Sequence, residues 1–119
     1  MRVLVVDDAA FVRAKIGRLL SANGYVIEEA ENGAEAVSKF QSYRPDIVLM
    51  DITMPVMDGI AAVRELRRLD PGVKVVVCTA LGQRAMVLEA IRAGARDFIV
   101  KPFDNERLLA AIERLANHG

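Results

Sequence analysis

The sequence predicts an α/β fold, a single doubly wound domain in which helices cover both faces of a five-stranded parallel sheet. Two observations lead to this fold class. Five short segments rich in β-branched residues alternate along the chain with amphipathic stretches. Three of these segments are apolar on consecutive residues, which is typical of parallel strands buried on both faces. We therefore expect right-handed crossover connections between successive strands.

The expected strands and helices follow one another along the whole chain. The strands lie at Arg2–Asp7, Tyr25–Ala30, Asp46–Asp51, Val73–Thr79 and Asp97–Lys101. After each strand, apolar residues recur three and four positions apart, which predicts a helix. These apolar positions are Val12, Ile16, Leu19 and Leu20, then Val37 and Phe40, Val63 and Leu66, Val87, Ala90 and Ile91, and finally Leu109, Ile112 and Leu115.

Glycine and proline mark the ends of the expected helices. Gly24, Gly72 and Gly94 each follow a helical segment, where a residue without a Cβ easily adopts the left-handed conformation. Pro45 and Pro71 prevent the helices before them from continuing. No linker or low-complexity tract interrupts the pattern, so we expect residues 1–119 to form one domain.

The composition excludes several classes of protein. Hydrophobic residues make up 53% of the 119 residues, which is enough to bury a core and excludes disorder. Sixteen basic residues balance sixteen acidic residues, so we expect neither nucleic acid nor a membrane as a partner. No apolar run approaches the roughly 20 residues of a membrane span, and acids follow the first apolar segment where a secretory signal has small residues. We expect a mature, soluble chain.

Polar side chains close four of the five expected strands. The first strand ends in Asp7 and Asp8, the third in Asp51, the fourth in Thr79 and the fifth in Lys101. Each residue alone has an ordinary explanation, such as a helix cap, a turn or a solvated charge. Together they indicate a site, because the carboxyl ends of parallel strands meet at the edge of the sheet where ligands bind. The second strand adds no such residue, as expected for an edge strand.

Three carboxylates at one edge of a sheet need compensation. Like charges about 4 Å apart repel by roughly 4 kcal/mol per pair at an effective dielectric near 20, more than the single Lys101 offsets. Proton uptake or a bound divalent cation resolves the repulsion. Oxygen ligands favour Mg²⁺, which leaves positions for phosphate oxygens. With the Thr79 hydroxyl and the Lys101 ammonium beside it, the site predicts phosphoryl transfer.

Other nucleophiles and cofactors are excluded by what the sequence lacks. No Gly-rich nucleotide-binding loop is present, so ATP and dinucleotides are poor candidates. Cys78, the only cysteine, excludes an intramolecular disulfide, fits a reducing cytoplasm and lies inside an expected buried strand. His118, the only histidine, is the penultimate residue and is expected to be frayed. The expected nucleophile is therefore a carboxylate.

Several motifs resemble, in order and across the whole chain, the receiver domain of two-component response regulators. They are Val3–Asp8, Asp46–Pro55, Met57–Gly59, Cys78–Ala80, Ala93–Ala95 and Phe98–Phe103. The segments Asp7–Phe11, Leu81–Gln83 and Ala85–Val87 are most similar to the stand-alone chemotaxis regulators of this family, in their non-enteric bacterial form. The resemblance implies a flavodoxin-like fold with strand order 2-1-3-4-5.

The resemblance also implies a role for each site residue. Asp51 is implied to be the phosphoacceptor, and Asp7, Asp8, Asp51 and the backbone carbonyl of Thr53 to hold Mg²⁺. Lys101 is implied to pair with Asp51 and then with the phosphoryl group, and to precede a cis peptide bond.

Two further residues are implied to switch the conformation. Thr79 is implied to donate to a phosphoryl oxygen, and Phe98 holds the switch-aromatic position. Phe98 stands where a tyrosine is common, so the contact of a tyrosine hydroxyl is absent. Thr53 and Leu81 are less polar than the corresponding pair in enteric chemotaxis regulators, which bears on the lifetime of the phosphoryl group.

By resemblance, the chain accepts a phosphoryl group from a histidine kinase and switches conformation to control an output protein such as the flagellar motor switch. A phosphatase is a further expected partner, and we expect a cytoplasmic monomer. Such a protein is no enzyme beyond its own phosphorylation and dephosphorylation. Without a helix-turn-helix motif, direct DNA binding is not expected.

Other readings of the sequence stay open. A single-domain phosphorelay intermediate, a receiver excised from a longer regulator and an engineered receiver scaffold share the same motifs. A haloacid-dehalogenase-type phosphatase also uses an aspartyl nucleophile with Mg²⁺, but it requires a second Asp at the position of Thr53. A flavodoxin-like electron carrier requires a Ser/Thr/Gly-rich loop after the first strand, where this chain has Asp7–Ala10.

Overall fold

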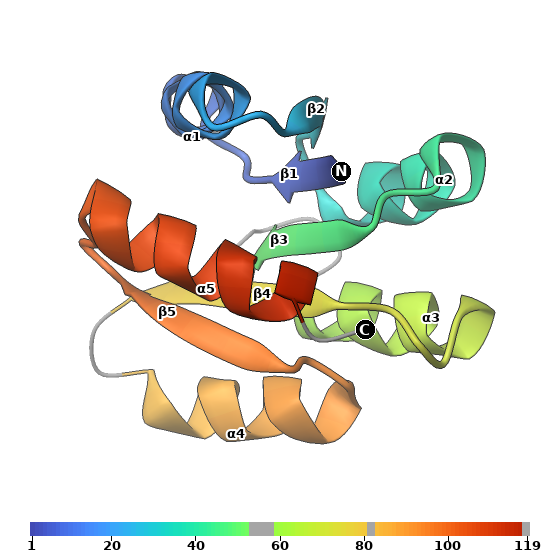
Figure 1. The fold of residues 1–119 in the computed structure, drawn as a ribbon. Coiled ribbons are helices and arrows are strands. Elements are labelled where there is room, and N and C mark those ends of the chain that lie inside the picture. The colour runs from blue at the N-terminus through green and yellow to red at the C-terminus, as the bar shows by residue number, and fades with distance from the viewer. Residues whose placement is uncertain (53–58, 81–82, 118–119) are drawn as a thin grey trace.

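The computed structural model describes residues 1–52, 59–80 and 83–117, which form a five-stranded parallel sheet with helices on both faces (Figure 1). The elements are β1 (Arg2–Val6), α1 (Ala10–Ala22), β2 (Val26–Ala30), α2 (Gly33–Tyr43), β3 (Ile47–Asp51), α3 (Gly59–Leu69), β4 (Val75–Ala80), α4 (Arg84–Ala93), β5 (Asp97–Lys101) and α5 (Asn105–Asn117). The strand order is β2-β1-β3-β4-β5. The predicted fold class and strand order are confirmed, and β2 lies at an edge.

Alternate residues of each central strand enter opposite halves of the core. In β1, Val3 and Val5 pack with α1 and α5, whereas Leu4 and Val6 pack on the side of α2, α3 and α4. Figure 1 shows the same division of the helices between the two faces. This two-sided burial is the physical reason that β1, β3 and β4 read as continuous apolar runs.

Some strand boundaries differ from the prediction by one or two residues. Val73 lies outside β4, because its N–H donates to the Asp70 carbonyl at 3.0 Å in a turn. At its other end β4 continues to Ala80, which pairs with Lys101. Asp7 lies one residue beyond β1, although its N–H still donates to Ala30 of β2 at 3.1 Å. Two further predicted strand residues precede their strands, Tyr25 and Asp46.

The helix ends agree with the glycine signals in two of three places. Gly24 and Gly94 have φ values of +91° and +128°. Gly72 is not among the residues with positive φ, so that prediction is wrong. Its N–H instead donates to the Asp70 side chain at 2.9 Å, which forms the turn without a left-handed residue.

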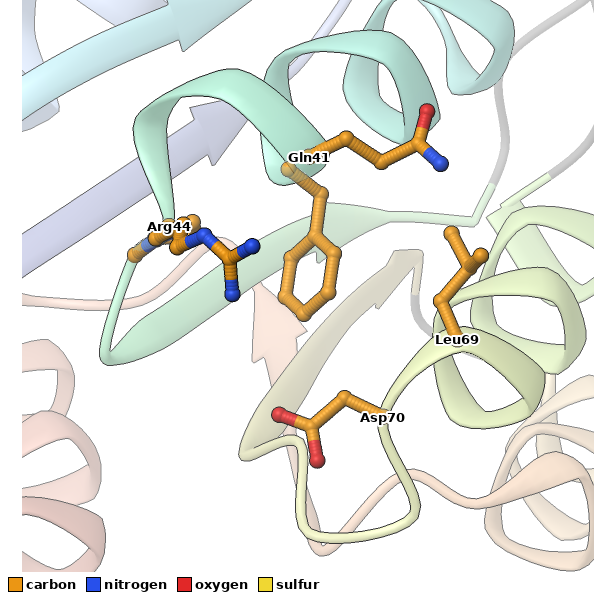
Figure 2. A pocket seen from close by; sticks show the side chains of 6 residues that line it. Gln41, Arg44, Leu69 and Asp70 are labelled. Atoms are coloured by element: carbon orange, nitrogen blue, oxygen red, sulfur yellow. The ribbon is translucent and has the colours of Figure 1, made fainter.

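The end of α2 is a feature that the sequence signals did not include. Arg44 adopts the left-handed conformation with φ 53° and donates its N–H to the Phe40 carbonyl. Figure 2 shows Arg44 and Asp70 on opposite sides of a hollow of about 540 Å³ between the ends of α2 and α3. Asp7, Asp8 and Asp51, the acidic residues at the strand ends, do not line this hollow. Within residues 1–52, 59–80 and 83–117, no helix has the length and apolar character that crossing a membrane requires.

Candidate functional site

The acidic residues at the ends of β1 and β3 meet at the carboxyl edge of the sheet. One carboxylate oxygen from each of Asp7, Asp8 and Asp51 lies within 4.8 Å of the others. Asp7 and Asp51 are 3% exposed, whereas Asp8 is exposed. The structure thus brings these three carboxylates together, as their positions at the ends of strands predicted. Thr53, the fourth expected metal ligand, lies outside the described residues.

Lys101 supplies the positive charge that faces this cluster. Its Nζ lies 2.9 Å from Asp7 Oδ2 and 3.3 Å from Asp51 Oδ2. Burial by itself would lower the pKa of Lys101, but the hydrogen bond to Asp7 and the charge of Asp51 outweigh burial and raise the pKa. The ammonium therefore stays charged. The sequence predicted the pair with Asp51 but not the shorter contact with Asp7, and the expected cis bond before Pro102 is present.

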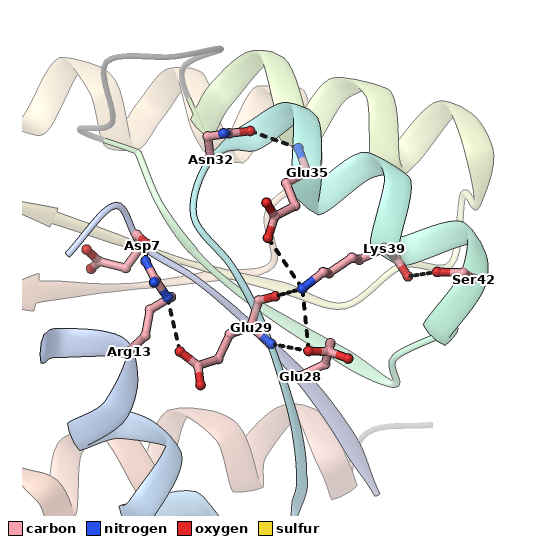
Figure 3. Close-up of polar contacts among 8 residues, drawn as sticks. All are labelled: Asp7, Arg13, Glu28, Glu29, Asn32, Glu35, Lys39 and Ser42. Atoms are coloured by element: carbon pink, nitrogen blue, oxygen red, sulfur yellow. Dashed lines mark hydrogen bonds and ion pairs between the residues drawn. The ribbon is translucent and has the colours of Figure 1, made fainter. Parts of the chain in front are cut away.

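The segment between β1 and α1 is held by bonds to Asp7. Ala9 N–H donates to Asp7 Oδ1 at 2.9 Å. Arg13, which lies beside Asp7 in Figure 3, donates from Nη1 to the Asp7 carbonyl at 2.6 Å. Ala9 is the N-cap of α1, and no side chain caps it. The ordinary explanation for Asp8 as a helix cap is therefore wrong, and its exposed carboxylate is available to a ligand. Arg13 was not predicted, because no motif signals it.

Thr79 and Phe98 lie on adjacent strands but in different environments. Thr79 is 1% exposed at the end of β4, and its hydroxyl donates to the Ala80 carbonyl at 3.4 Å, which is a weak hydrogen bond. Phe98 of β5 is 46% exposed. Both line a hollow of about 480 Å³ beside α4. The structure therefore connects the two proposed switch residues through one open space.

Cys78 lies next to the site but cannot act as its nucleophile. Its side chain is buried in β4. Burial, chiefly, together with the nearby carboxylates Asp51 and Asp7, raises the pKa of the Cys78 thiol to about 12, although Lys101 acts in the opposite direction. The thiol is therefore protonated at neutral pH, as expected for a core cysteine. His118 lies outside the described residues.

The donor set of this site fits a hard divalent cation. Its three converging carboxylates are all-oxygen ligands, and one of them is exposed, so a cation can keep bound water and accept phosphate oxygens. Asp51 is buried at the end of the central strand and faces an ammonium. The arrangement places a buried carboxylate beside a positive charge, the combination that phosphoryl transfer to a carboxylate requires.

Comparisons with known proteins identify relatives that cover nearly the whole chain. The family model described as response regulator receiver domain matches residues 3–113. Chemotaxis protein CheY of Bacillus subtilis is 53% identical over 117 residues, with 98% of both chains covered. Chemotaxis protein CheY of Thermotoga maritima is 53% identical over 116 residues, with 97% of both chains covered. The crystal structure of a CheX–CheY–BeF₃–Mg²⁺ complex from Borrelia burgdorferi matches with a TM-score of 0.91 and 34% identity, over 98% of this chain and 89% of that chain.

Proposed function

This chain belongs to the response regulator receiver domain family, which acts in two-component signalling, and we propose that its phosphoacceptor is Asp51. The observation that carries this proposal is the carboxylate cluster of Asp7, Asp8 and Asp51 with Lys101 against it. Asp51 closes β3, the central strand, between the two other acids, which follow β1, and the lysine on β5. A histidine kinase is the proposed phosphoryl donor.

The proposed reaction transfers the phosphoryl group without a change in oxidation state. A carboxylate oxygen of Asp51 attacks phosphorus of a kinase phosphohistidine, so that an O–P bond forms as the N–P bond breaks. The imidazole leaves with the electron pair and takes a proton from water. Asp7, Asp8 and Asp51 would hold Mg²⁺, which neutralises charge on the carboxylates and the incoming phosphoryl oxygens. Lys101 is placed to bind a phosphoryl oxygen, since its Nζ already contacts Asp51 Oδ2.

We expect the Asp51→Asn variant to remain unmodified under conditions that phosphorylate the parent protein. The amide removes the anionic nucleophile and keeps nearly the same shape. Intact-mass spectrometry after treatment with acetyl phosphate and Mg²⁺ should show one added phosphoryl group on the parent and none on the variant. Equal labelling of both proteins would assign the phosphoacceptor elsewhere.

The proposed output surface is the face of α4, β5 and α5. Large apolar side chains are exposed on α4 and β5, with Leu88 at 52%, Ile91 at 41% and Phe98 at 46%. Next to them, Arg107 and Arg114 of α5 line a hollow of about 250 Å³ together with Phe98. Exposed apolar residues rimmed by charge are typical of a protein-binding surface. A flagellar motor-switch protein is the proposed partner, and a phosphatase is a second one.

The Phe98→Ala variant is expected to lose most of the phosphorylation dependence of partner binding. Movement of the Thr79 hydroxyl toward a phosphoryl oxygen opens space for Phe98 to turn into the hollow that both residues line. Such coupling is typically about 1–3 kcal/mol, or roughly 5–150-fold in affinity. Binding of a motor-switch peptide should be measured with and without beryllofluoride, a phosphoryl mimic.

The matched control for this experiment is Val26→Ala, because Val26 is an exposed apolar residue of β2, at the edge of the sheet opposite β5. We expect it to retain the response to beryllofluoride. Acetyl phosphate should still label Asp51 in the Phe98→Ala variant. An unchanged response in that variant would remove Phe98 from the switch and leave the chemistry at Asp51 intact.

A further inference from the structure

Arg13 of α1 joins the acidic segment to the edge strand of the sheet. Its Nη1 donates to the Asp7 carbonyl at 2.6 Å, and its Nε donates to Glu29 Oε1 at 3.0 Å. Figure 3 shows the guanidinium between these two partners. The Arg13 side chain is 14% exposed, whereas the Glu29 side chain is 47% exposed. The guanidinium is therefore largely shielded from solvent, while its Glu29 partner lies at the surface.

The carbonyl that Arg13 binds belongs to the peptide unit between Asp7 and Asp8. Because the peptide unit is planar, fixing this oxygen also fixes the N–H of Asp8 and the direction in which the chain continues. Asp7 has further anchors, namely its N–H bond to Ala30 and its side-chain contact with Lys101. The Asp8 side chain has no hydrogen bond or ion pair with any residue in the described parts of the chain. Its place in the cluster therefore depends on the main chain that Arg13 holds.

The second partner of Arg13 belongs to β2, whose main chain is bonded to α2. Glu29 lies in β2, and the Glu29 carbonyl accepts a hydrogen bond from Lys39 Nζ of α2 (Figure 3). Lys39 also pairs with Glu28 at 3.5 Å and with Glu35 at 3.3 Å. Arg13 therefore connects the Asp7–Asp8 peptide unit, through the Glu29 side chain, to a strand whose main chain is bonded to α2.

We infer that Arg13 is a positioning residue for the cation site, holding Asp8 in reach of Asp7 and Asp51. This inference rests on the proposed function, because it concerns the proposed Mg²⁺ site. The charge of Arg13 and its positioning of Asp8 have opposite effects on the affinity for Mg²⁺. A positive charge near the carboxylates opposes the binding of a cation, so a role through charge alone means that removing Arg13 tightens Mg²⁺ binding. A positioning role means that removing Arg13 weakens it. The sign of the change therefore separates the two roles.

The test is a Mg²⁺ titration of the parent, Arg13→Ala and Arg13→Lys proteins, followed by ¹⁵N NMR. Loss of a side chain that orients a metal ligand typically weakens metal binding by 10–100-fold, so we expect about tenfold or more for Arg13→Ala. Arg13→Lys keeps the charge, but one ammonium does not reproduce the planar fork that spans two acceptors. Its affinity should fall between those of the parent and of Arg13→Ala. Arg68→Ala, which removes an exposed arginine of α3 paired with Glu65, should bind Mg²⁺ like the parent.

A second measurement uses the metal-free proteins. Backbone order parameters of Asp8 and Ala9 should be near 0.85 in the parent, the value typical of rigid chain, and should fall toward about 0.6 in Arg13→Ala. Order parameters in α5 should stay unchanged, which also shows that the variant is folded. This readout concerns the segment that carries Asp8 and does not require phosphorylation or bound metal.

The outcomes of the two measurements are distinct. Weaker Mg²⁺ binding in Arg13→Ala, with partial recovery in Arg13→Lys and a loosened Asp8 segment, supports the inference. Equal or tighter Mg²⁺ binding in Arg13→Ala overturns it, as does an equal loss in Arg68→Ala. If the parent itself does not bind Mg²⁺, the proposed cation site fails, and the inference fails with it. If the parent binds Mg²⁺ and Arg13→Ala binds it equally well, only the inference fails.

Discussion

Replacing Gly59 with alanine is expected to destabilise the protein by about 1–3 kcal/mol, the usual cost of overpacking a core. A Cβ at Gly59 would lie 2.5 Å from the Asp51 carbonyl oxygen and 2.6 Å from Ile52 Cα. Both are main-chain atoms at the end of β3, so they cannot move aside as a flexible side chain does. The start of α3 or the end of β3 must shift, and the end of β3 carries Asp51. Urea unfolding followed by circular dichroism measures the loss.

Gly17→Ala is the matched control for this substitution. Gly17 lies in the interior of α1, and a Cβ there would meet Ile27 Cγ2 at 3.7 Å, an ordinary contact. Because alanine is the better helix former, this variant should be more stable than the parent by about 0.5–1 kcal/mol. We also expect slower acetyl phosphate labelling of Gly59→Ala and unchanged labelling of Gly17→Ala. A Gly59→Ala protein as stable as the parent would contradict the close packing of α3 on β3.

Mg²⁺ is expected to stabilise the parent protein by roughly 2.7 kcal/mol at a concentration a hundred times its Kd, through preferential binding to the folded state. The Asp8→Ala variant should lose most of this gain. Asp8 is exposed and does not cap α1, so its removal leaves the packing unchanged. Without metal, the variant should be as stable as the parent or more stable, because one of three crowded charges is gone.

Calorimetry is the appropriate measurement because the chain has no Trp. Melting curves of the parent and of Asp8→Ala should be recorded with and without Mg²⁺. Glu89→Ala removes an exposed carboxylate from α4 and should respond to Mg²⁺ as the parent does. A parent protein whose melting point is indifferent to millimolar Mg²⁺ would contradict the cation site.

Most of the fold could be predicted because local patterns and tertiary environment agree in this chain. The apolar runs Val3–Val6, Ile47–Met50 and Val75–Cys78 predicted central strands, and the structure buries these runs on both faces of the sheet. The errors lie at element ends. Gly72 was expected to be left-handed, but the Asp70 side chain forms that turn, and Arg44 adopts the left-handed conformation without a glycine. At these ends a single hydrogen bond outweighs a statistical preference.

The clustering of Asp7, Asp8 and Asp51 was predictable for a different reason. Parallel strands place their carboxyl ends at one edge, so residues that end β1 and β3 come together whatever the helices between them contain. This topological rule brought Asp7, Asp8 and Asp51 together from their positions in the chain alone. The same rule does not predict which side chains reach the site from the face of a helix. Arg13 is such a side chain, and no motif pointed to it.

The sequence by itself determined the fold class, the order of elements and the carboxylates of the site, because hydrophobic periodicity and strand ends are local properties. Only the tertiary structure decided which polar partners these carboxylates have. Lys101 contacts Asp7 as well as Asp51, and Arg13 reaches the Asp7 carbonyl and Glu29 at once. Such pairings depend on distances of about 3 Å between residues of different elements, and a small change in this distance makes or breaks the hydrogen bond. Residue type and spacing along the chain do not determine those distances, because they arise only when helices and sheet pack together.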